Sequence, residues 1–172
     1  METTTETKQD MGMNAAPQDE HRWLQQMVGD WTFEGESLMG PDQPPVKHQG
    51  SETVRAIGEF WVQGDGQGEM PGGGSMQMQF TLGFDPEKKR FVGTFIASMM
   101  PTLWIYEGGL ESDLKTLALL ADGPNMSDPG KTAKYKDVIE IKNQDHRILS
   151  SHIQAADGSW QRFMVAHYRR RK

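Results

Sequence analysis

The chain has 172 residues, which suits one domain with a core large enough to need no disulfide or structural metal. It contains no cysteine, which excludes disulfides, zinc–thiolate sites and cysteine nucleophiles. Its formal net charge of -6 argues against a general nucleic-acid binder or a binder of anionic membranes, and no apolar run approaches the ~20 residues that span a bilayer.

The first residues of the chain are polar and offer almost nothing to bury. We therefore predict a disordered tail at 1–17, followed by a single domain at 18–172. The tail has neither the basic start nor the apolar stretch of a secretion signal. Because a cysteine-free chain also suits a reducing compartment, the sequence predicts a cytoplasmic protein.

One helix is predicted at 19–28. Four apolar residues share one of its faces: Trp23, Leu24, Met27 and Val28. Asp19 and Glu20 place negative charge in the first turn, where the helix dipole favours it, and Gly29 ends the helix. A helix this short needs a surface to pack on, so we expect it to cap the rest of the domain.

After the helix the apolar period changes from that of a helix to alternation, which is typical of half-buried strands. The clearest case is 76–84, where methionine, phenylalanine and leucine alternate with glutamine, threonine and glycine. Further strands are predicted at 31–39, 54–62, 91–99, 103–111, 115–121, 134–143, 147–155 and 159–169. About ten short strands with one early helix predict an all-β, antiparallel barrel, whose closure leaves no exposed edge strand.

The segment 64–76, GDGQGEMPGGGSM, is rich in glycine. It lacks the Lys-Ser/Thr pair and the following helix of a phosphate-binding loop. We predict a mobile hairpin loop at the mouth of the barrel, where it would act as a lid.

Methionine is frequent, with 12 residues. Five of them raise the alternative of a Cu(I) thioether site: Met70, Met76, Met78, Met99 and Met100. Met76 and Met78 lie on the apolar face of a predicted strand, where core packing explains them. We therefore predict no metal site and a deformable apolar lining instead.

Several stretches together carry a family resemblance. They are LQQMVGDWTFEG at 24–35, TLGFDPEKKRFVGTFI at 81–96, GGLESDLKTLAL at 108–119, DPGK at 128–131 and FMVAHYRRR at 163–171. In these stretches the chain resembles a bacterial family of unknown function, DUF1579, whose members are similar to calycin or lipocalin-like barrels. The resemblance implies a fold and no activity. The chain departs from the family pattern at 58–59, 95–97 and 165, so polar family residues there are not carried over.

The resemblance also gives a role to the Gly-x-Trp at 29–31. In lipocalin-like barrels this tryptophan closes the bottom of the barrel under an arginine from the last strand, a favourable cation–π arrangement. The residues expected to close the barrel are Trp23, Trp31, Arg169 and Arg170, with Arg162 also available. Direct contact of Trp31 with a ligand is the alternative.

The function that the sequence favours is binding of a small, largely apolar molecule in the barrel cavity. The expected lining combines aromatic and methionine side chains with a few polar groups that orient the ligand. The candidate residues are Arg55, Trp61, Met78, Phe80, Phe95, Met99, Trp104, Tyr106 and His152. The mouth is expected where Trp61, the glycine loop 64–75 and the segment 99–104 gather.

An enzyme of the same shape is one alternative. It would use Arg55, Tyr106 or His152 as acid, base or anion anchor, and it would show a buried polar cluster with perturbed pKa values. Because neither Gly-x-Ser-x-Gly nor His-Glu-x-x-His occurs, the sequence favours a binding protein over an enzyme. A homodimeric structural protein is another alternative, and both monomer and homodimer stay open.

Haem binding is a further alternative. The chain is distantly similar to the nitrobindin-like haem barrels, which hold haem through a histidine on a late strand, where this chain has His152 and His167. His21 and His48 are expected to face solvent. Apart from this alternative, no cofactor is predicted.

Overall fold

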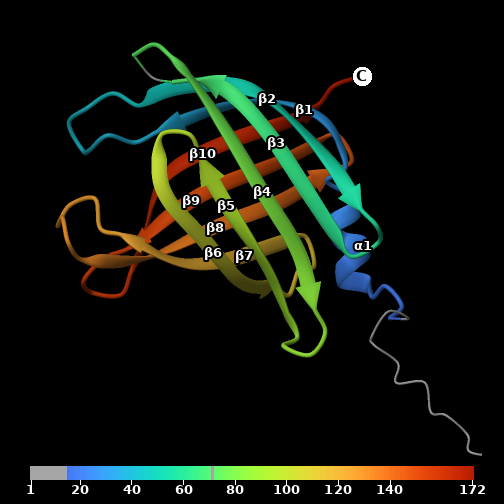
Figure 1. Cartoon of the computed structure of the whole chain (residues 1–172). Coiled ribbons are helices and arrows are strands. Elements are labelled where there is room, and N and C mark those ends of the chain that lie inside the picture. The colour runs from blue at the N-terminus through green and yellow to red at the C-terminus, as the bar shows by residue number, and fades with distance from the viewer. Residues whose placement is uncertain (1–14, 71) are drawn as a thin grey trace, which may run out of the picture.

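The computed structural model describes residues 15–70 and 72–172, which form a closed barrel of ten antiparallel strands with one short helix (Figure 1). The helix α1 spans Asp19–Gln25. The strands are β1 Gly29–Ser37, β2 Val46–Ile57, β3 Trp61–Glu69, β4 Ser75–Asp85, β5 Arg90–Ala97, β6 Met100–Leu110, β7 Thr116–Pro124, β8 Thr132–Asn143, β9 His146–Gln154 and β10 Trp160–Arg170.

Each strand pairs with the next one along the chain, and β1 closes the barrel by pairing with β10. The predicted antiparallel barrel is confirmed. Most of the predicted disordered tail, residues 1–14, lies outside the described residues. None of the described residues belongs to a helix with the length and hydropathy of a membrane-spanning segment.

Alternation along each strand separates the barrel interior from the outer surface. In β4, Met76 and Leu82 are buried in the interior, whereas Gln77 is exposed on the outer face. The same parity places Leu117 and Leu119 of β7 in the core, both almost completely buried. Burial of one face of every strand provides the main driving force for closing the sheet.

The predicted strand 54–62 is wrong, because a tight turn divides it. β2 ends just before Gly58, which adopts a positive φ of 61°, and β3 begins at Trp61. Val54 and Val62 nevertheless both face the interior. The apolar alternation therefore continues on both sides of the turn and does not reveal it.

The predicted extent of the glycine-rich hairpin loop, 64–76, is also wrong, whereas its role as a lid stays a prediction. Residues 64–69 belong to β3, and only 70–74 connect this strand to β4. A Cβ atom at Gly64 would overlap the ring of Phe80 on β4. Glycine is needed here so that a large aromatic side chain can lie against the backbone of the neighbouring strand.

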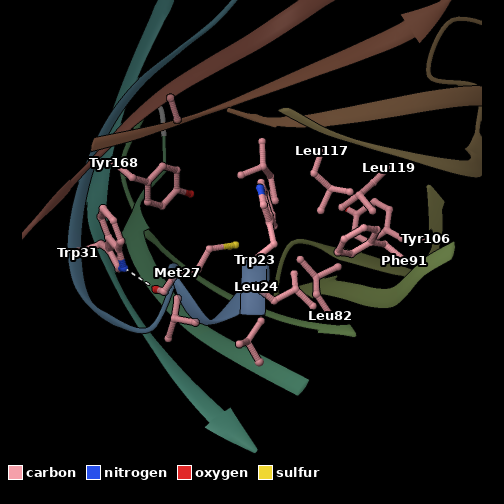
Figure 2. Close-up of a cluster of buried hydrophobic side chains, with 14 of the residues drawn as sticks. Trp23, Leu24, Met27, Trp31, Leu82, Phe91, Tyr106, Leu117, Leu119 and Tyr168 are labelled. Atoms are coloured by element: carbon pink, nitrogen blue, oxygen red, sulfur yellow. Dashed lines mark hydrogen bonds between the residues drawn. The ribbon is translucent and has the colours of Figure 1, made fainter. Parts of the chain in front are cut away.

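The helix and two tryptophans close one end of the barrel (Figure 2). Trp23 donates its indole N–H to the carbonyl of Leu114 at 2.9 Å, and Trp31 donates to the carbonyl of Met27 at 2.8 Å. Leu24 and Met27 have no accessible surface. The short helix is thus held by buried apolar contacts and by hydrogen bonds of both indoles.

Arg170 is the arginine of the last strand that lies over Trp31. Its guanidinium carbon is 4.2 Å from the centroid of the indole ring. The guanidinium also donates to three backbone carbonyls at 2.6–2.9 Å, those of Gln26, Val28 and Gln144. Arg169 is exposed on the outer face, because neighbouring residues of a strand point to opposite sides, so its predicted role in closure is corrected.

Candidate functional site

A cavity of about 170 Å³ lies inside the barrel. Much of its lining is apolar, including Met78, Phe80, Phe95, Leu119, Leu149 and Met164. Two groups of polar side chains also line it, and together we call them the polar wall. One group is Glu52, Arg147 and Tyr168, and the other is Tyr106, Asp137 and Ser151.

The first polar group is a buried ion pair that crosses the barrel interior. Arg147 on β9 donates through Nη2 to Oε1 of Glu52 on β2, and the two residues are only 2% and 6% exposed. Strands β1 and β10 lie between β2 and β9 in the sheet, so the pair joins strands that are not neighbours. Its two opposite charges balance each other away from water.

Aromatic rings cover the guanidinium of Arg147. Its central carbon lies 4.8 Å from the ring centroid of Trp31 and 4.0 Å from that of Tyr168. Its Nε is buried and has no hydrogen-bond partner among the described residues. The hydroxyl of Tyr168 points into the barrel (Figure 2), and burial, followed by the negative charge of Glu52, raises the pKa of this phenol.

The second polar group is centred on Asp137 of β8. The Tyr106 hydroxyl donates to Oδ2 at 2.5 Å, and the Ser151 hydroxyl donates to Oδ1 at 2.6 Å. Burial raises the pKa of the Asp137 carboxyl, although both hydrogen bonds oppose this shift. Burial and the neighbouring Asp137 charge raise the pKa of Tyr106 well above its usual value.

Two histidines that were expected in solvent are inside the fold. His48 faces the cavity from β2, its Nδ1 is buried without a partner among the described residues, and burial lowers its pKa. His21 is 1% exposed, with its Nδ1 accepting from the backbone N–H of Gln18 at 2.9 Å. Its Nε2 lies 3.0 Å from the Phe84 carbonyl, so a proton on Nε2 satisfies both contacts.

Four of the predicted cavity residues do line the cavity: Met78, Phe80, Phe95 and Tyr106. Three others lie on the outer face, because each has the opposite strand parity. Arg55 is exposed and donates to Gln63 at 2.6 Å, while Trp61 is 41% exposed. His152 places its Nδ1 3.2 Å from the Lys136 carbonyl, on the outer side of β9.

The last two predicted cavity residues are also corrected. Met99 is 45% exposed in the turn between β5 and β6, because β5 ends at Ala97. Trp104 points inward but packs edge-on against Tyr135 at 4.8 Å, outside the cavity lining. Trp61 follows the turn 58–60, which contacts α1 through Glu59. The loop 70–74 lies at the other end of β3, so Trp61 and this loop do not gather at one mouth, contrary to the prediction.

The late-strand histidines on which the haem alternative depends point outward. His146 and His167 stack on the outer face with ring centroids 5.2 Å apart, and His152 also lies outside. The cavity volume of about 170 Å³ is below the ~300–1,000 Å³ of common ligand pockets. The residues present therefore do not fit a haem held inside the barrel. Within the described ranges, no three His, Cys, Asp or Glu side chains are grouped to hold a metal.

Most of the polar wall was missed from the sequence, although a signal was present. Glu52 has the same strand parity as Val54, Asp137 the same as Ile139, and Arg147 the same as Leu149. A charged residue in phase with the apolar face of a strand must point inward. Without the register between strands, this signal does not show which of these charges meet.

Replacing Asp137 with asparagine is expected to change how stability depends on pH. The folded pKa of Asp137 is raised above the ordinary 3.8, so the folded chain binds this proton more tightly than the unfolded chain. The resulting stability is fully present below the unfolded pKa and is lost as pH rises through the folded pKa. Denaturation from about pH 4 to about pH 8 should show the wild type losing stability relative to D137N. A difference that stays constant over this range would contradict the assignment.

Two solved structures share the barrel fold. The S-type phycobiliprotein lyase CPES from Guillardia theta is 14% identical, with a TM-score of 0.60, and the match covers 91% of this chain and 99% of that one. Rv2717c from M. tuberculosis is 12% identical, with a TM-score of 0.58 and coverage of 91% and 100%. At these identities the likeness shows the fold alone. Among curated proteins, none matches this chain.

A family model covers nearly all of the described chain. The model, described as "Protein of unknown function (DUF1579)", matches residues 16–170. This range contains α1 and all ten strands, and therefore both the closed end and the polar wall. The chain belongs to the DUF1579 family.

Proposed function

We propose that this protein binds a small, largely apolar molecule in the cavity of the barrel. The observation that carries the proposal is the cavity itself, about 170 Å³ in volume with apolar and polar walls. Protein cores are packed almost without voids larger than a water molecule. A space of this size in the interior is therefore a feature that a binding site explains and core packing alone does not.

The size of the cavity limits the ligand. Apolar cavities of about 150 Å³ hold one benzene molecule. A volume of about 170 Å³ therefore suits one six-membered ring with a small substituent. Met76, Met78 and Met164 line it with flexible thioether side chains, which adapt to ligands of slightly different shape.

Catalysis in the same cavity is a second candidate, and one observation favours it. Tyr106, Asp137 and Ser151 form a polar cluster in which the pKa values of Tyr106 and Asp137 are raised, as an enzyme of this shape would require. Ser151 donates to a carboxylate, however, and not to an imidazole that would activate it as a nucleophile. Binding is therefore the better supported function. If the wild type converted a substrate and D137N still bound that substrate without converting it, catalysis would become the better supported function.

Filling the cavity is expected to abolish binding of a small aromatic probe. Ala166 on β10 lines the cavity and is 1% exposed, so Ala166→Leu places three more carbon atoms in it. Calorimetric titration should show the wild type binding toluene with a Kd of about 0.1–1 mM, which is within the efficiency of very small ligands. Ala166→Leu should weaken this binding at least about tenfold, or 1.4 kcal/mol.

The matched control is Ala118→Leu, the same substitution on the outer face of β7. It should bind toluene within about twofold of the wild type. Circular dichroism would verify folding, and Ala166→Val is the smaller change if the leucine variant unfolds. Absence of toluene binding to the wild type, or equal binding by Ala166→Leu, would overturn the proposal.

A further inference from the structure

We infer that the molecule bound in the cavity carries a protonated amine and that the Asp137 carboxylate is its counter-ion. This inference rests on the proposed binding function and assigns the ligand a chemical class. It follows from the charges on the cavity wall, from the free acceptor positions on Asp137 and from the groups that cover Arg147.

The cavity wall carries one carboxylate that no cation balances. Its lining includes the acidic residues Glu52 and Asp137 and one permanent cation, Arg147. Arg147 is already paired with Glu52. His48, the other basic group, has its pKa lowered by burial, which favours its neutral form. Asp137 is thus the carboxylate of the lining that no permanent cation pairs with, and the nearby His152, on the outer face of β9, has its own pKa lowered by burial.

The hydrogen bonds of Asp137 leave room for a further donor. Each carboxylate oxygen accepts one bond, from Tyr106 or from Ser151. A carboxylate offers about four acceptor positions, so about two remain. A primary ammonium brings three N–H donors and a positive charge, and such charge-assisted bonds are about twice as strong as neutral ones. Burial raises the pKa of Asp137, and a cation beside it would oppose that shift.

An anionic ligand is disfavoured by the position of Arg147. Its guanidinium is paired with Glu52 and lies over the rings of Trp31 and Tyr168. Its Nε has no hydrogen-bond partner among the described residues, but its positive charge is already balanced by Glu52. A second anion would therefore bring an unbalanced negative charge into a wall that also carries Asp137.

The other walls suit the apolar part of an amine. Phe80 and Phe95 are directly paired across β4 and β5 and face the cavity. Their rings provide apolar contact for a hydrocarbon group and can also attract a nearby cation. The expected ligand class is therefore a primary amine attached to one ring or to a short hydrocarbon chain.

The experiment compares four probes of similar shape by calorimetric titration near neutral pH: benzylamine, benzyl alcohol, toluene and benzoate. For the wild type, benzylamine should bind at least about tenfold more tightly than toluene, and benzoate should bind most weakly. In Asp137→Asn the advantage of benzylamine over toluene should fall to about twofold or less. The matched control is Asp122→Asn, which removes the same charge from the exposed face of β7 and should keep the advantage.

The outcomes separate this inference from the proposed function. Toluene binding with no preference for benzylamine, or a preference that survives in D137N, would overturn the inference and leave the binding function intact. Tighter binding of benzoate would also overturn the inference. If no probe binds, the proposed function itself fails. The comparison of probes on the wild type decides the inference even if D137N does not fold.

Discussion

Replacing Arg147 with alanine is expected to lower the free energy of unfolding by about 3–5 kcal/mol, among the largest losses for a single residue of this protein. The variant leaves the Glu52 carboxylate buried and unpaired, since Glu52 is 6% exposed and Arg147 is its cationic partner. It also removes the guanidinium that lies over Trp31 and Tyr168. Guanidinium denaturation followed by tryptophan fluorescence would measure the loss.

A double variant separates the unpaired charge from the lost packing. Glu52→Leu with Arg147→Met removes both charges and keeps most of the side-chain volume. Replacing a buried ion pair by apolar residues is often neutral or stabilising by about 1–4 kcal/mol, so the double variant should be clearly more stable than Arg147→Ala. An Arg147→Ala variant within about 1 kcal/mol of the wild type would show that Glu52 becomes hydrated or protonated without difficulty.

Replacing Trp31 with alanine is expected to destabilise the protein by a similar amount, about 3–5 kcal/mol. Trp31 is 1% exposed, and its indole N–H bonds to the carbonyl of Met27 at 2.8 Å. Its ring also contacts the guanidinium groups of Arg170 and Arg147. Truncation therefore opens a cavity at the closed end and removes the surface on which both arginines lie. Thermal and chemical unfolding would both report the change.

Trp61→Ala is the matched control, because it deletes the same side chain from the outer face. Trp61 is 41% exposed at the start of β3, and its loss should change the free energy of unfolding by about 1 kcal/mol or less. Equal losses in the two variants would mean that burial at the closed end contributes little. The comparison thus tests whether the Gly-x-Trp of this chain stabilises barrel closure.

The closed end and the polar wall share one residue, which links stability to the proposed site. Arg147 lies over the ring of Trp31, which closes the barrel, and is paired with Glu52, which lines the cavity. The same guanidinium therefore supports the end of the barrel and neutralises one of the two carboxylates of the cavity wall. As a result, the Asp137 carboxylate is the negative charge left for the proposed ligand. The Arg147→Ala and Trp31→Ala variants test different parts of this network.

Local pattern was sufficient to predict the fold. Alternation such as that in 76–84 is a property of a single strand, because successive side chains point to opposite faces whatever the partners are. One early helix and about ten strands then leave an antiparallel barrel as the architecture that hides every edge. The closing role of the Gly-x-Trp at 29–31 and of an arginine near residue 170 came instead from the resemblance to lipocalin-like barrels.

Most of the site could not be predicted, because it depends on strand register and on packed volume. Glu52 and Arg147 are 95 residues apart in the chain, and only the closure of β1 on β10 brings them into contact. Arg55 and His152 were predicted inside the barrel because they were assigned the wrong strand parity. An error of one residue is enough to move a side chain to the opposite face of a sheet.

The sequence by itself determined that this protein is an antiparallel barrel with one early helix, since those features follow from local alternation, while the closing role of Trp31 came from the resemblance to lipocalin-like barrels. Only the tertiary structure decided which arginine lies over Trp31, that an ion pair crosses the interior, and that a cavity of about 170 Å³ lies beside Asp137. Each of these depends on the distance between side chains of different strands, which no pattern along one strand contains.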